Sequence, residues 1–188
     1  VEAEIAPLRD LTALFNAENP QRLDLETFAI GAMFDQVLKA ANLRLGPMTS
    51  GRYSLEREIE ASGGRSRRGL GIKVSDVYTG KSRSPATLSG GETFIAALAL
   101  ALGLSDVVES VSGKIRLDTI FIDEGFGSLD TDDSGTLDQV LQVLTNLVSQ
   151  RRSVGLISHV PFVQDVIPNG FFVRKDMHGS HVEARGAL

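Results

Sequence analysis

The spacing of apolar residues along the chain predicts four helices. Apolar positions recur every three or four residues in residues 1–15, 23–43 and 132–150, as one buried helical face requires. Residues 93–104 are almost wholly apolar and indicate a buried helix. The residues expected to face the core from the second and fourth helices are Phe28, Phe34, Val37, Leu38 and Ala41, and Leu137, Val140, Leu141, Leu144 and Val148.

Shorter runs with strand character predict strands at residues 52–60, 69–78, 118–122, 153–158, 171–175 and 181–185. The runs at 118–122 and 153–158 are apolar and rich in β-branched residues, which is typical of neighbouring buried strands in a parallel sheet. The helix at 132–150 would then cross between them. Strands that alternate with helices predict an α/β fold.

Leu88-Ser89-Gly90-Gly91-Glu92 directly precedes the most apolar helix. Five specified residues match by chance on the order of 10⁻⁶ per position at average residue usage. Ser89 and Glu92 have the spacing of a capping box. Capping does not account for Gly90 and Gly91, which are poor helix formers and indicate a close approach to the backbone. Because a helix N-terminus favours anions, the motif predicts a contact with phosphate.

Asp123 and Glu124 end the apolar strand at 118–122 and are followed by a turn at 125–130. Ligands of open α/β sheets bind beyond the carboxyl ends of the strands. One carboxylate there can hold Mg²⁺ through water, and the other can orient and deprotonate an attacking water. A solvated acidic turn is the alternative, but the strand before it and the motif at 88–92 favour the chemical role.

His159 directly follows the strand at 153–158. If the two apolar strands are parallel neighbours, His159 lies on the same sheet edge as Glu124. A histidine can donate a hydrogen bond to a phosphate oxygen or to the attacking water. Taken alone, His159 would be interpreted as a loop or cap residue, and its position on this edge reverses that interpretation.

Together these motifs resemble the second half of an ABC-type ATPase head, and in detail the SbcC family of DNA-repair ATPases, which are relatives of the SMC proteins. The resemblance is specific between residues 76 and 160 and extends loosely over 23–185. It is carried by the stretches at 88–108, 123–130 and 155–160, and by Val77-Tyr78-Thr79-Gly80 with Arg83. It implies a P-loop-NTPase-like sheet with helices, that is, the C-terminal half of such a head plus a short coiled-coil stub.

The resemblance implies roles for individual residues, with ATP and Mg²⁺ as cofactors. Asp123 would be the Walker B aspartate that holds Mg²⁺ through water, Glu124 the catalytic base, and His159 the switch histidine. The signature, which contacts the γ-phosphate of ATP held by the opposite subunit, would be Ser89, Gly90, Gly91 and Glu92. The D-loop, which crosses the dimer interface, would be Ser128, Leu129 and Asp130.

A P-loop requires G-x-x-x-x-G-K-[ST] between a strand and a helix. The sequence has one Gly-Lys-Ser, at 80–82, but Ser75 occupies the position of the first glycine, and residues 83–85 do not begin an apolar helix. We therefore reject it as a Walker A site. In the family the P-loop lies in an N-terminal lobe beyond a long coiled coil. We expect this chain to be the C-terminal lobe, with residues 1–16 the end of the coiled-coil arm and 17–188 the lobe.

Charge and composition add limits. The net charge of −5 argues against strong DNA binding by this lobe alone, because neutralisation of phosphates dominates DNA affinity. Basic residues are nevertheless concentrated between residues 63 and 84, with one acid, Asp76, among them: Arg65, Arg67, Arg68, Lys73, Lys81 and Arg83. We favour a solvated hairpin tip over a DNA or partner contact, and both interpretations remain open.

The chain contains no cysteine, which excludes disulfides and cysteine metal sites. Its longest apolar run, 94–104, is shorter than a bilayer span, so we expect a cytoplasmic protein with no membrane partner. His178 and His181 flank a glycine turn. Without a third ligand nearby, an exposed turn is a better interpretation of this pair than a metal site.

The resemblance implies a head that dimerises on ATP and controls a partner nuclease. The expected partners are the N-terminal P-loop lobe of the same protein, a second copy of the head, an SbcD-type nuclease and double-stranded DNA ends. Two alternatives stay open. One is the head of a chromosome-organising SMC-type protein, which a nuclease partner would exclude. The other is an ABC transporter ATPase fragment, which would need a P-loop on the same chain and a helical subdomain for membrane coupling.

Overall fold

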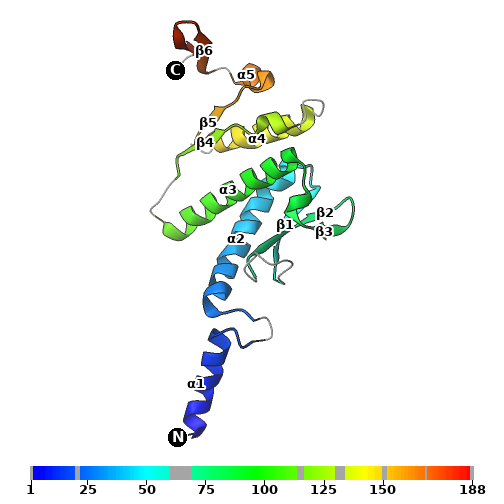
Figure 1. The fold of residues 1–188 in the computed structure, drawn as a ribbon, viewed down its shortest axis with the longest axis vertical. Coiled ribbons are helices and arrows are strands. Elements are labelled where there is room, and N and C mark those ends of the chain that lie inside the picture. Colours follow the sequence, from blue (N-terminus) through cyan, green and yellow to red (C-terminus); the bar gives the residue numbers. More distant parts are fainter. Residues whose placement is uncertain are drawn as a thin grey trace.

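Figure 1 shows the computed structural model, which describes residues 2–19, 22–59, 69–113, 117–129, 134–149, 152–167 and 169–186. Within these ranges the helices are α1 (Glu2–Phe15), α2 (Leu25–Met48), α3 (Gly90–Ser112), α4 (Ser134–Ser149) and α5 (Pro161–Val166). The strands are β1 (Tyr53–Glu58), β2 (Gly71–Asp76), β3 (Lys81–Arg83), β4 (Thr119–Asp123), β5 (Ser153–Ile157), β6 (Gly170–Asp176) and β7 (Gly179–Arg185). Two 3₁₀ turns are η1 (Pro85–Thr87) and η2 (Phe126–Ser128).

The core is built on the packing of α2 against α3. Val37, Leu38 and Ala41 of α2 are buried, as predicted. At the crossing, a Cβ atom on Gly103 would lie 2.5 Å from the Ala41 nitrogen and 2.8 Å from the Val37 oxygen. The two backbones therefore touch, and only glycine at this position allows the helices to come so close.

The prediction of a core position is wrong for two residues. Phe28 is 65% exposed, because the first turns of α2 extend beyond the end of α3 (Figure 1). Val148 is 52% exposed and Leu147 is buried in its place, so the buried face of α4 runs through positions 137, 140, 141, 144 and 147. Helical spacing correctly predicted the helices. It does not show how far the neighbouring element extends along each helix, and therefore which turns are covered.

An antiparallel sheet with the order β1-β2-β3 packs against α2. Its first two strands confirm the predictions at 52–60 and 69–78, with Tyr53 opposite Asp76 and Leu55 opposite Val74. β3 was not predicted, because Lys81-Ser82-Arg83 is short and polar. The basic residues Arg65, Arg67 and Arg68 lie outside the described residues.

β4 and β5 form a parallel pair, as predicted, with Thr119 opposite Ser153 and Asp123 opposite Ile157. The prediction that these strands are buried is only half right. Ile122 is buried, but Phe121 on the other face is 76% exposed, and its ring lies over Gly155, where a Cβ atom would be 2.5 Å from it. Among the described residues the pair has one covered face and one open face.

The chain ends in the antiparallel hairpin β6–β7, which confirms the predicted terminal hairpin. Phe171, Val173 and Val182 of this hairpin are all more than 60% exposed. The imidazole of His181 lies 3.0 Å from the carboxylate of Asp176 across the hairpin.

α3 is long and apolar enough to cross a membrane by length and composition, because the helix extends well beyond the apolar run at 94–104. It nevertheless packs along α2, and Ile95, Ala99 and Leu102 lie in the core. Packing of this kind is that of the central helix of a folded domain.

We expect Gly103→Ala to lower the free energy of unfolding by about 1–3 kcal/mol. The added methyl group meets backbone atoms of α2 that cannot rotate away, and this overpacking outweighs the roughly 1 kcal/mol by which alanine favours a helix over glycine. Urea denaturation followed by circular dichroism measures the change. Leu104→Ala, at a 51% exposed neighbouring position, is the control and should change the free energy by less than Gly103→Ala. Equal stability of Gly103→Ala and the wild type would contradict the close crossing.

Candidate functional site

The motif at 88–92 forms the N-terminus of α3, as predicted. Ser89 is the N-cap, and its hydroxyl accepts a hydrogen bond of 3.2 Å from the Glu92 N–H. The Glu92 carboxylate in turn accepts one of 2.9 Å from the Ser89 N–H. The capping box is thus complete, and Ser89 and Gly90 are both exposed at the surface.

The structure explains why one of the two signature glycines, Gly91, has no side chain. Gly91 is buried, and a Cβ atom there would lie 2.7 Å from the carbonyl oxygen of Ser128 and 3.3 Å from Leu129. The predicted close approach to the backbone exists, but at Gly91 the chain's own turn makes it rather than a ligand. A Cβ atom on Gly90 would make only an ordinary contact of 3.7 Å with the side chain of Ser128, so there is space beside Gly90.

The turn after β4 is folded onto the first turns of α3. Phe126 is buried and meets the ring of Phe94 edge to face, with 5.2 Å between the ring centroids. Gly125 has a φ of +98°, and a Cβ atom on it would overlap Phe94. The Ser128 hydroxyl donates a hydrogen bond of 2.6 Å to the carbonyl oxygen of Gly125 and closes the turn. Asp130, the third predicted D-loop residue, lies outside the described residues.

Glu124 and His159 meet at the edge of the parallel pair, as predicted. The Glu124 N–H donates to the carbonyl oxygen of Ile157 at 2.9 Å, which extends the pairing of β4 with β5 by one residue. Nδ1 of His159 lies 3.0 and 3.1 Å from the two carboxylate oxygens of Glu124. Both side chains are more than half exposed, so substrate can reach them.

Asp123 is exposed at the end of β4, directly before Glu124. The described residues contain no group of three or more side chains that could hold a metal ion. One exposed carboxylate nevertheless fits Mg²⁺, which retains several waters and takes one or two carboxylates together with phosphate oxygens. Asp123 would hold the ion, and the ion would neutralise charge on the phosphates.

An ionic cluster around the buried Asp76, beside the signature, was not predicted from the sequence. The Tyr53 hydroxyl donates a hydrogen bond of 2.5 Å to Glu92, and Arg52 and Arg83 lie between Glu92 and the buried Asp76. The sequence contains one indication of this cluster, because Asp76 is the one acid in a basic stretch. In the structure Asp76 is 1% exposed, and a buried carboxylate needs a cationic partner.

Burial and neighbouring charges shift the pKa values in this cluster. Burial, followed by the hydrogen bond to the Glu92 carboxylate, raises the pKa of Tyr53 to about 12, so its hydroxyl is a donor at neutral pH. Burial by itself would raise the pKa of Glu92. The hydrogen bonds from Tyr53 and the Ser89 N–H, with Arg52 nearby, outweigh burial and lower that pKa below its ordinary value, which keeps Glu92 charged.

The backbone of Glu124 is strained, with a φ of +59°. Left-handed backbone costs an ordinary residue roughly 1–2 kcal/mol, while glycine adopts it freely. We therefore expect Glu124→Gly to be more stable to urea than Glu124→Ala by about 1 kcal/mol. Both variants remove the carboxylate, so their difference isolates the backbone. If Glu124→Ala were instead more stable than Glu124→Gly, as alanine usually is relative to glycine, the strained geometry would be contradicted.

Sequence comparisons agree with the motifs. The family described as "SbcC/RAD50-like, Walker B motif" matches residues 57–143. The SbcC subunit of the SbcCD nuclease from Vibrio cholerae is 47% identical over 89% of this chain. The protein of the same name from Treponema pallidum is 40% identical over 95% of the chain. The chain spans 16% and 17% of the lengths of these two relatives.

Comparison of structures identifies the fold. A solved structure described under "Structural biochemistry of ATP-driven dimerization and DNA stimulated activation of SMC ATPases" superposes with a TM-score of 0.64. The match covers 85% of this chain and 89% of that one, at 15% sequence identity. The fold is thus that of SMC head domains, and by sequence the chain is similar to SbcC proteins over most of its length and to the SbcC/RAD50-like family over residues 57–143.

Proposed function

We propose that this chain is the C-terminal lobe of an SbcC-like ATPase head, and that the whole protein hydrolyses ATP with Mg²⁺ between two such heads. One observation carries the proposal: the turn that presents Asp123 and Glu124 is packed through Ser128 onto Gly91 of the signature helix. The edge that carries the proposed catalytic residues is thereby packed directly against the proposed phosphate-binding N-terminus.

Each side chain then has a distinct task. Glu124 accepts a proton from the attacking water. His159, whose Nδ1 lies 3.0 Å from it, holds the carboxylate in place in the tautomer protonated at Nδ1 and donates to a phosphate oxygen in the tautomer protonated at Nε2. Asp123 holds the Mg²⁺ shell. Ser89 offers its exposed hydroxyl, and Gly90 its backbone N–H, to the γ-phosphate bound by a second head.

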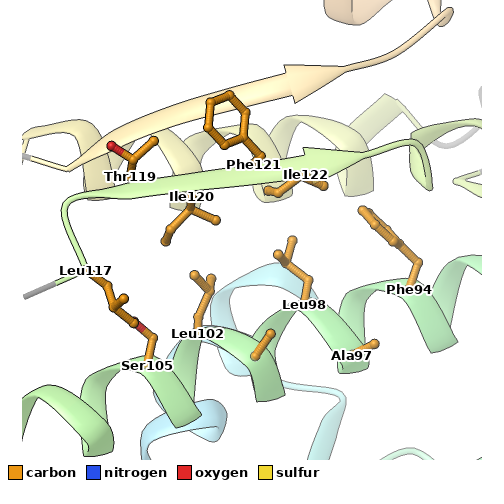
Figure 2. Close-up of a pocket in the computed structure, with 11 residues that line it drawn as sticks. Phe94, Ala97, Leu98, Leu102, Ser105, Leu117, Thr119, Ile120, Phe121 and Ile122 are labelled. Carbon is orange, nitrogen blue, oxygen red and sulfur yellow. The ribbon is translucent and has the colours of Figure 1, made fainter.

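The N-terminal P-loop lobe is the proposed occupant of an open apolar groove between α3 and β4. Figure 2 shows side chains of both elements facing this groove, whose volume is about 380 Å³. The lining is almost wholly apolar and includes Phe94, Leu98, Leu102, Leu117 and Ile120. β4 pairs with β5 along one edge, and no described strand pairs along its other edge. A strand from the P-loop lobe would continue the sheet and cover the groove.

The names of the sequence relatives favour a nuclease-coupled role over a chromosome-organising or transporter role, and we propose that the protein acts in the cytoplasm. Two proteins at 40–47% identity are named as the SbcC subunit of the SbcCD nuclease. On this basis the proposed partners are a second head, an SbcD-type nuclease and double-stranded DNA ends. A chromosome-organising SMC-type head is the second candidate, favoured by the fold match alone. Copurification with a nuclease distinguishes the two.

We expect the isolated chain to bind MgATP weakly or not at all, since its sequence contains no Walker A motif and the signature offers only the far half of a site. Isothermal titration measures this. Adding the P-loop lobe in trans should restore binding. A tight one-to-one complex of MgATP with this chain alone would overturn the assignment as a half-site.

In the full-length protein, Glu124→Gln should reduce hydrolysis by at least roughly 10²-fold, as is typical for the loss of a general base. ATP binding and ATP-dependent dimerisation should survive, because the amide keeps the shape of the side chain. Asp123→Asn should also weaken nucleotide binding through the loss of Mg²⁺. Steady-state hydrolysis and fluorescent-nucleotide titration separate the two variants. If both lost binding equally, the division of roles between Asp123 and Glu124 would be wrong.

A further inference from the structure

The capping box of the signature is tied to the antiparallel sheet. One carboxylate oxygen of Glu92 accepts the 2.9 Å hydrogen bond from the Ser89 N–H. The other accepts the 2.5 Å bond from the hydroxyl of Tyr53 on β1, and Nη1 of Arg52 lies 3.8 Å from the same oxygen. The carboxylate that orients Ser89 is therefore held from a second element.

Arg83 fixes the segment that leads from β3 into the signature. Its Nη1 donates to the carbonyl oxygen of Thr87 at 2.8 Å and to the Thr87 hydroxyl at 2.9 Å. Its Nη2 donates to the Tyr53 hydroxyl at 3.2 Å. One guanidinium thus connects the residue two positions before Ser89 with the phenol that holds Glu92.

The buried carboxylate of Asp76 is paired with both arginines. It is 1% exposed and accepts hydrogen bonds from Arg52 at 3.3 and 3.5 Å and from the Tyr78 N–H at 3.0 Å. Nη2 of Arg83 lies 3.7 Å from it. Two arginines face two carboxylates, Asp76 and Glu92, so charge is balanced within the cluster.

The cluster controls the start of α3 more than its body. The buried positions of α3 that pack in the hydrophobic core begin at Ile95, nearly two turns beyond Ser89, and make their own contacts with the rest of the core. Removing the Tyr53 hydroxyl leaves the buried ring and this core in place. It removes the hydrogen bond that holds the Glu92 carboxylate from outside the capping box, leaves only the 3.8 Å contact with Arg52 on that oxygen, and so loosens the orientation of the exposed Ser89.

We propose that Tyr53 and Arg83 are positioning residues for the signature, which hold Ser89 in place before a second head arrives. The inference rests on the proposed function, in which Ser89 contacts a nucleotide on that second head. Neither residue touches that nucleotide. Both act through Glu92 and the segment 84–88, and so they control association of the heads rather than the chemical step.

The test uses Tyr53→Phe in the full-length protein. ATP-dependent dimerisation, measured by sedimentation with a non-hydrolysable ATP analogue, should weaken roughly tenfold, the scale of one lost hydrogen bond to a charged group. Loading of fluorescent nucleotide on the P-loop lobe should not change. Hydrolysis per head should fall at low protein concentration and recover at high concentration, since only association is impaired. A merely structural role would not produce that recovery.

Tyr78→Phe is the matched control, because Tyr78 stacks on Arg52 in the same cluster but is 73% exposed and its hydroxyl makes no hydrogen bond to a described residue. It should dimerise as the wild type does. Arg83→Lys keeps the charge but not the three donated bonds, so it should repeat the Tyr53→Phe defect. Arg83→Lys also carries the test if circular dichroism shows that Tyr53→Phe does not fold.

Ser89→Arg separates failure of this inference from failure of the proposed function. If Ser89→Arg abolishes dimerisation while Tyr53→Phe and Arg83→Lys dimerise as the wild type does, the positioning role is overturned and the proposed function stands. If Ser89→Arg itself dimerises normally, the signature makes no contact with a second head and both are overturned. A defect in Tyr53→Phe that persists at high protein concentration also overturns the positioning role.

Discussion

At Gly91 the backbone of α3 lies against the carbonyl oxygen of Ser128, at a distance that leaves no room for a side chain. This contact places the turn after β4 on the N-terminus of the signature helix. Two more glycines allow close packing around the same site. Gly125 lets the turn pass Phe94, and Gly103 lets α3 approach α2. Any Cβ atom at these three positions would push apart the elements that carry the candidate site.

The same packing accounts for the strained backbone at Glu124. A positive φ at a residue other than glycine persists only where its surroundings fix it more strongly than the strain opposes it. Here the Glu124 N–H is bonded to Ile157, and two residues later Phe126 is buried against Phe94. The carboxylate consequently leaves the sheet edge in a fixed direction toward His159, although both side chains are largely in solvent.

Much of this arrangement could be predicted from the sequence, because motifs and periodicities are local. The capping box, the parallel strands and the meeting of Glu124 with His159 all follow from short stretches of residues. The exposure of Phe28, Phe121 and Val148 could not be predicted, since it depends on which element covers each face. The cluster around Asp76 joins residues up to 40 positions apart, so the sequence marks Asp76 as a lone acid among basic residues but does not identify its partners.

The charges around the signature bear on why a nucleotide would need two heads. Arg52 and Arg83, the two arginines of the cluster beside the signature, are each paired with Asp76, and Arg52 also faces Glu92. Among the described residues, the exposed N-terminus of α3 therefore offers a phosphate the Ser89 hydroxyl, N–H groups and a helix dipole but no unpaired arginine of this cluster, in a chain of net charge −5. We expect such a surface to attract an anion too weakly to hold it alone. Under the proposed function, that weakness makes the second head's P-loop indispensable, and the signature then meets ATP only where two heads come together.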